Sequence, residues 1–150
     1  MALHLREQIT VAVVTAVTSL TTTGANVFRD RDTEAEPLRD AELPGLVVLY
    51  AGGDATIMSM GVNRLLERHL RLTIEAHVKL ATGYGAKLNL ILQEIEVALA
   101  SASLGGAKYG HLTDEGAREV SAAGETRIAR QSFTYEFYYV VAHNAPDVAH

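Results

Sequence analysis

The chain has 150 residues, of which 48% are apolar and 21% are charged, with a formal net charge of −5 and no cysteine. This length and composition suit one globular domain over residues 1–150 and exclude disorder along the whole chain. The lack of cysteine excludes a disulfide framework, a thiolate nucleophile and a cysteine-built zinc site. The acidic balance argues against a free-standing DNA-binding protein, whose affinity depends on Lys and Arg at phosphates.

The N-terminal segment carries one apolar stripe at helical spacing. It predicts an α-helix from about residue 3 to residue 22, ended by Gly24 at the position after the helix. The stripe consists of Leu5, Ile9, Val13, Ala16, Val17 and Leu20. The longest apolar stretch, 9–20, is too short to span a bilayer. No secretory cleavage site accompanies it, so we expect neither a targeting segment nor a membrane partner.

After a possible short strand at 26–28, residues 29–42 form a charged excursion with three arginines and six acids. It offers almost nothing to bury and is predicted to be solvated. A long loop in a small domain is often functional, so a plain loop and a contact surface both stay open. The candidate interface or lumen residues are Arg29, Asp30, Arg31, Asp32, Glu34, Glu36, Arg39, Asp40 and Glu42.

Two strands are predicted in the middle of the chain. Residues 46–50 are continuously apolar and bounded by glycines, which is typical of a strand covered on both faces. From His69 to Leu80, polar residues occupy every odd position and apolar residues every even one. Strict alternation over this length indicates a long strand with one wet face and one buried face.

The C-terminal half predicts a helix at 86–101 and a final strand at 132–142. Between them, the glycine-rich stretch is weakly patterned, with a possible strand near 117–121. Four aromatic residues alternate on one face of the final strand and are interpreted as core, while Tyr138 on the opposite face is a candidate surface contact. Residues 143–150 are predicted to be a flexible tail. The fold is therefore α+β, a mainly antiparallel sheet of about four to five strands packed with two helices.

No pattern in the sequence indicates a catalytic, cofactor-binding or metal site. His69 and His77 share a strand face, but eight residues of strand separate them by roughly 26 Å. The segment 83–87 precedes a helix but lacks the remaining residues of a phosphate-binding loop. The aromatic strand with Arg127 and Arg130 nearby leaves a nucleic-acid-binding sheet as a weaker alternative, and an enzyme with a scattered active site as another.

The order of elements resembles the tail terminator, or tail completion, proteins of long-tailed bacteriophages. The resemblance rests on the N-terminal helix ending in Thr23-Gly24-Ala25-Asn26-Val27-Phe28 and on the charged excursion leading to Leu43-Pro44-Gly45-Leu46-Val47-Val48-Leu49-Tyr50. It continues with the alternating strand 68–80, the helix 86–101 and a last strand of the Phe133-Thr134-Tyr135-Glu136-Phe137 type. Residues 105–126 match only loosely.

The resemblance implies a structural assembly protein without catalysis or cofactor. Such a protein forms a hexameric ring on the tail tube, stops tube polymerisation and offers a docking face to the head–tail connector. DNA passes through its lumen without specific binding, and an acidic lumen suits that passage. The implied location is the virion tail, with assembly in the host cytoplasm. Another neck or tail component, such as a connector adaptor or a tube subunit, is the alternative within the same class.

Overall fold

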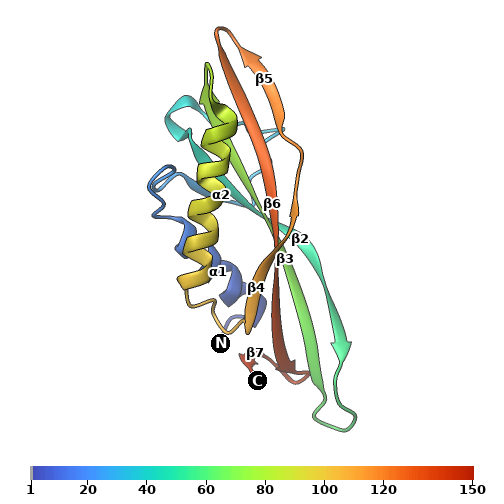
Figure 1. Ribbon diagram of the computed structural model, residues 1–150. Helices are drawn as coiled ribbons and strands as arrows, with labels where there is room; N and C mark the ends of the chain where they lie inside the picture. Colours follow the sequence, from blue (N-terminus) through green and yellow to red (C-terminus); the bar gives the residue numbers. More distant parts are fainter. Residues whose placement is uncertain (1) are drawn as a thin grey trace.

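The computed structural model describes residues 2–150, which form two α-helices, one short 3-10 helix and one seven-stranded sheet (Figure 1). The helical segments are α1 (Leu5–Val17), η1 (Asp40–Glu42) and α2 (Tyr84–Ser101). The strands are β1 (Val27–Arg29), β2 (Gly45–Ile57), β3 (Leu65–Leu80), β4 (Tyr109–Glu115), β5 (Glu119–Ala123), β6 (Thr126–Ala142) and β7 (Ala145–Ala149).

The sheet is built around the antiparallel pair β3–β6, which is hydrogen-bonded along the whole of β3. β2 pairs with the other edge of β3, and β1 adds in parallel to β2. β5, β4 and β7 pair in that order along the outer edge of β6. The α+β class and the mainly antiparallel sheet are confirmed. The strand number exceeds the expected four to five because β6 is long enough to pair with three short strands.

Both helices cover the same face of the sheet (Figure 1). The even positions of β3 from Leu70 to Val78 point to this face and are buried, as the alternating pattern predicts, and the four aromatic residues of β6 join them. Each fully buried side chain of this size contributes on the order of 2 kcal/mol of burial free energy. The main contributors are Leu70, Leu72, Ile74, Phe133, Tyr135, Phe137 and Tyr139, packed against Ile9 and Val13 of α1 and Ile91 and Ile95 of α2.

The first helix is shorter than the sequence predicts, since α1 ends at Val17 and is capped at Thr18. The Thr18 hydroxyl donates to the Val14 carbonyl, and Leu20 then forms an isolated bridge with Gly24. Gly24 adopts a positive φ of 56° in this turn, not at the end of the helix. Threonines compete for backbone hydrogen bonds, which explains why the helix stops at the start of the threonine-rich segment.

The second strand is much longer than residues 46–50. A register shift between Tyr50 and Gly53 absorbs the glycines as a bulge, and pairing with β3 then continues to Ile57 opposite Leu66. The glycines bend the strand without ending it. The distal parts of β2 and β3, with their connection, form a hairpin that projects beyond the helices at the lower right of Figure 1. We call residues 51–68 the arm and residues 57–64 the arm tip.

The structure differs from the sequence prediction at two C-terminal places. The glycine-rich stretch holds β4 as well as β5, and the strand predicted near 117–121 is displaced to Glu119–Ala123. The expected flexible tail 143–150 contains β7, whose Ala149 pairs with Val141. Gln8 of α1 donates from its side chain to the Asp147 carbonyl at 2.8 Å, so a helix as well as the sheet holds this segment.

Candidate assembly surfaces

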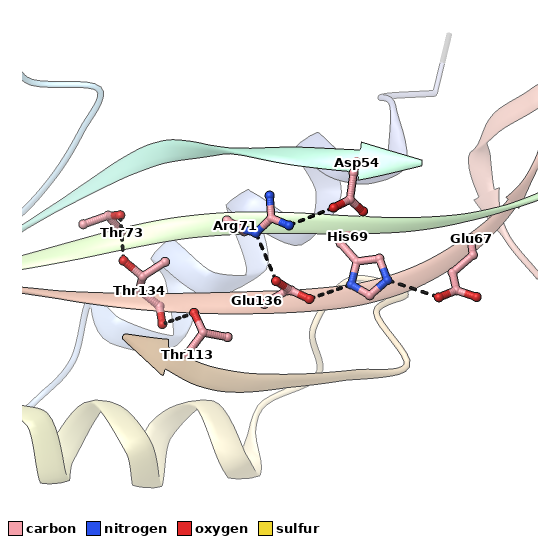
Figure 2. Close-up of polar contacts among 8 residues, drawn as sticks. All are labelled: Asp54, Glu67, His69, Arg71, Thr73, Thr113, Thr134 and Glu136. Carbon is pink, nitrogen blue, oxygen red and sulfur yellow. Dashed lines mark hydrogen bonds and ion pairs between the residues drawn. The ribbon is translucent and has the colours of Figure 1, made fainter. Parts of the chain in front are cut away.

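The helix-free face of the sheet carries a row of paired polar side chains (Figure 2). His69 on β3 lies between two carboxylates, with Nδ1 2.6 Å from Glu136 and Nε2 3.1 Å from Glu67. Arg71 donates to the second oxygen of Glu136 at 3.0 Å and to Asp54 on β2 at 2.8 Å. These five residues, which we call the polar ladder, tie three neighbouring strands together across the face.

The ladder changes the acid–base behaviour of its members. Burial alone lowers the pKa of His69, but hydrogen bonds to Glu67 and Glu136 outweigh burial and raise it. Burial alone raises the pKa of Glu136, but hydrogen bonds from His69 and Arg71 outweigh it and lower the pKa. Both shifts favour the charged pair. The ladder therefore pairs both of its basic groups with carboxylates, and its three carboxylates leave a negative excess on this face.

Further along the same face, the charged excursion covers the odd positions of β3. Glu75 and His77 were predicted to face solvent, yet both are buried. His77 Nε2 lies 3.2 Å from Glu75, and the Thr33 hydroxyl of the excursion lies 3.3 Å from the same carboxylate oxygen. The hydrogen bond from His77 lowers the pKa of Glu75. Lys79 reaches Asp40 at 2.9 Å, so the excursion is fastened at both ends of this region.

Arg31 holds the charged excursion together through contacts inside the segment. Arg31 donates to the carbonyls of Glu36 and Pro37 at 3.0 and 2.8 Å and to the Glu42 carboxylate at 3.1 Å. Its guanidinium also lies over the Phe28 ring, 4.9 Å from the centroid. This is the geometry of a folded loop held by one planar cation. The excursion is thus an ordered segment with much of its surface exposed.

The other candidate residues of the excursion divide into paired and unpaired groups. Arg29 forms two hydrogen bonds with Glu7 of α1, at 2.5 and 2.6 Å, and lies 3.4 Å from Asp30. Asp32 accepts from the backbone of its own turn. Within residues 2–150, the exposed side chains of Glu34, Glu36 and Arg39 form no ion pair. Those three remain the candidates for contact with a partner, while Arg29 and Arg31 have intramolecular roles.

Tyr138, the other candidate contact, lies half-buried on the helix-free face. Its ring stacks on Tyr109 of β4, with centroids 4.9 Å apart, and meets the His69 ring edge-on at 5.5 Å. Burial is the main cause that raises the pKa of Tyr138. The sequence placed Tyr138 on the correct face but could not show that Tyr109, on a strand without a clear pattern, covers part of its ring.

The arm tip is a surface that the sequence analysis did not single out. Four apolar side chains there are exposed, and Met60 and Val62 have relative accessibilities of 86% and 88%. The tip is ordered locally, since Met58 donates to the Leu65 carbonyl at 2.9 Å and the Ser59 hydroxyl accepts from the Leu65 amide at 3.0 Å. The signal for such a surface was the apolar run Ile57, Met58, Met60 and Val62 beside a glycine in a turn.

A second apolar surface lies on α2, facing away from the sheet. Leu90 and Val97 are spaced seven residues apart and exposed, at 43% and 63%. They line an open groove of about 380 Å³ together with the turn that follows α1. The groove residues are Ser19, Leu20, Thr21, Leu90, Gln93, Glu94, Val97 and Ala98. One oxygen of Glu94 accepts from the Thr22 amide at 3.4 Å, which holds the carboxylate at the groove.

The hollow beside the charged excursion is another candidate site for chemistry, but its titratable groups are paired. Over residues 2–150, no group of three or more His, Asp and Glu side chains is arranged to hold a metal ion. A hollow of about 410 Å³ between the excursion and β5 contains His77, Glu119 and Arg130. There Arg130 is bonded to Glu119, and His77 to Glu75. Gly83 has a positive φ of 77° at the start of α2, which explains that glycine as a turn residue.

Neither helix in the described part of the chain combines the length and the hydropathy needed to cross a membrane. No protein-family model matches the chain, and no curated protein matches it. Among solved structures, 32 chains are similar. One is a chain of "Virion of native gene transfer agent (GTA) particle", with a TM-score of 0.42 and 16% identity, covering 86% of this chain and 93% of that chain. This TM-score is too low to support a conclusion about function. The function of this chain is therefore inferred from its own surfaces.

Proposed function

We propose that this chain is a structural protein of a phage-like particle that forms a ring, caps the tail tube and presents a docking face to the head–tail connector. It acts through surfaces and performs no catalysis. The observation that carries the proposal is the exposed apolar arm tip, held by strand pairing beyond the helices. A large apolar surface presented to water in an ordered element is typical of a protein–protein contact.

The proposal also draws on the order of elements along the chain, which resembles tail terminator proteins. Closed rings need heterologous contacts, in which two different patches of one subunit meet those of its neighbours. The arm tip and the α2 groove are two such patches. A sheet without such protruding or grooved elements would offer no matching pair of surfaces for a ring contact.

The helix-free face suits a lumen through which DNA passes. Four of its basic side chains lie within ion-pair distance of carboxylates: His69 and Arg71 with Glu136, Lys79 with Asp40, and Arg130 with Glu119. Phosphate binding requires cations that can release counterions, and cations already neutralised by carboxylates are poor phosphate ligands. The negative charges of Glu34 and Glu36 weakly repel the phosphates of DNA. We assign this face to the lumen within the same proposal.

Inactivation of the gene in its phage or prophage tests the proposal. A tube without its cap keeps an end to which further rings add, so tails of abnormal and variable length, not joined to filled heads, are expected by electron microscopy. The matched control restores the gene in trans. Normal-length tails joined to heads would overturn the proposal. Normal-length tails left unjoined would assign the chain to the connector instead, and absent tubes would make it a tube subunit.

A further inference from the structure

We propose that the arm tip of one copy of this chain seats in the α2 groove of a second copy. The inference rests on the proposed ring and identifies the subunit contact that builds it. The tip supplies Met58, Met60 and Val62, and the groove receives them between α2 and the turn at residues 19–21. Arg64, at the end of the tip, lies beside Glu94 of the receiving copy.

The two surfaces match in chemistry. The tip is convex and apolar, and the groove is concave, with Leu90 and Val97 exposed along it. The groove is shallow and open, with a volume of about 380 Å³, so it can receive a few side chains laid against its surface. Methionine has three flexible bonds and a polarisable sulfur, so Met58 and Met60 adapt to an irregular groove. Burial of these surfaces against each other removes both from water.

The two surfaces also match in charge. The arm tip contains one charged residue, Arg64, whose guanidinium reaches only the Gly61 carbonyl, at 3.3 Å, among the described residues. The groove contains one charged residue, Glu94, whose bond to the Thr22 amide is long. A pair of opposite charges at the rim of an apolar contact fixes its register. The arrangement leaves neither charge buried alone, which would be costly.

The tip and the groove of one copy cannot meet. The arm is held in the sheet by the pairing of Ile57 with Leu66, and the His143 amide at the end of β6 donates to the Arg64 carbonyl at 2.9 Å. Figure 1 shows the arm extending beyond the lower ends of both helices, away from α2. Each copy therefore has one donor surface and one acceptor surface, and the contact is heterologous.

Engineered cysteines test the contact directly, because the natural chain contains no cysteine. Two purified single variants, Val62→Cys and Val97→Cys, are mixed at high protein concentration and oxidised. A disulfide requires the two Cα atoms to come within about 7 Å, so a docked tip favours the mixed dimer. A mass tag on one variant separates this mixed dimer, on a non-reducing gel, from the homodimers that each exposed cysteine also forms by collision. The matched control replaces Val97→Cys by Val120→Cys, an exposed valine on β5. We expect a dimer with the first pair and none above background with the second.

Charge reversal provides the second readout. Arg64→Glu and Glu94→Arg each weaken association by about five-fold in light scattering or sedimentation, and mixing the two variants restores the pairing at this contact. Circular dichroism of each variant checks that the fold is kept, so that weaker association is due to the contact.

The outcomes separate this inference from the proposed function. If rings form but the Val62–Val97 crosslink does not, the inference is overturned and the proposed ring stands. Crosslinked chains that grow as open filaments support the contact and contradict the cap. Equal crosslinking to Val97→Cys and Val120→Cys, or copies that neither associate nor crosslink, overturn the inference.

Discussion

Nδ1 of His69 lies 2.6 Å from Oε1 of Glu136, across the central strand pair β3–β6 and on the face that no helix covers. The second carboxylate oxygen of Glu136 binds Arg71, so one acid links two cations on the neighbouring strand. This link places a group that titrates near neutral pH in the middle of the surface that we assign to the lumen.

Replacement of His69 by Gln makes stability less sensitive to pH. The pKa of His69 is raised in the folded state, so its contribution is fully present below its unfolded value of about 6.5 and is lost as pH rises through the raised value. The free energy of unfolding of the wild type minus that of His69→Gln should therefore fall as the pH rises above about 6.5. Urea unfolding at a series of pH values measures it, and a constant or rising difference would contradict the shift.

Replacement of Ile74 by Asp should prevent folding, whereas replacement of Thr73 by Asp should not. Ile74 is fully buried under the helices, and an unpaired charge there costs several kcal/mol, comparable with the whole stability of a small domain. Thr73 points to the other face, where its hydroxyl lies 3.2 Å from Thr134, and its loss costs about 1 kcal/mol. Soluble yield and thermal unfolding of the two variants check this. Similar behaviour would mean that the register is wrong.

Replacement of Arg31 by Ala should loosen the charged excursion, because Arg31 holds two carbonyls and the Glu42 carboxylate. Limited proteolysis within residues 30–42 should become several-fold faster, with the rest of the chain protected. Arg39→Ala is the matched control, since the Arg39 side chain is exposed and has no ion pair within residues 2–150. Equal protease resistance of both variants would exclude Arg31 as the organiser of the excursion.

Replacement of Gly110 by Ala should destabilise the protein by about 1–3 kcal/mol. A Cβ at Gly110 would press against the Phe137 ring, which belongs to the buried aromatic face of β6. Gly85→Ala is the control, because a Cβ there meets only the flexible end of Arg118 in the first turn of a helix. Denaturant unfolding compares the two variants, and an unchanged midpoint for Gly110→Ala would show that β4 moves away at no cost.

The sequence alone was sufficient to identify the two central strands and α2, although β6 begins at Thr126 and not at the predicted residue 132. Alternation along β3 and the aromatic alternation of β6 each assign every side chain to one face, because a strand repeats every two residues and one face is covered by helices. The apolar spacing of α2 likewise follows from its one buried side. In each of these elements, apolar residues recur at the buried positions with the period of the strand or helix, so a short stretch of sequence is enough to predict the element.

Only the tertiary structure decided the remaining features, because each depends on residues that are distant in sequence. Glu75 and His77 are buried because Thr33 and its neighbours fold over them. β4 has both faces largely exposed and therefore no apolar pattern, so its place follows from pairing with β6. The arm tip and the α2 groove are exposed for the same reason, as their apolar side chains have no covering segment within residues 2–150. Local periodicity reports whether a side chain is covered, and the identity of the covering segment is a property of the folded chain.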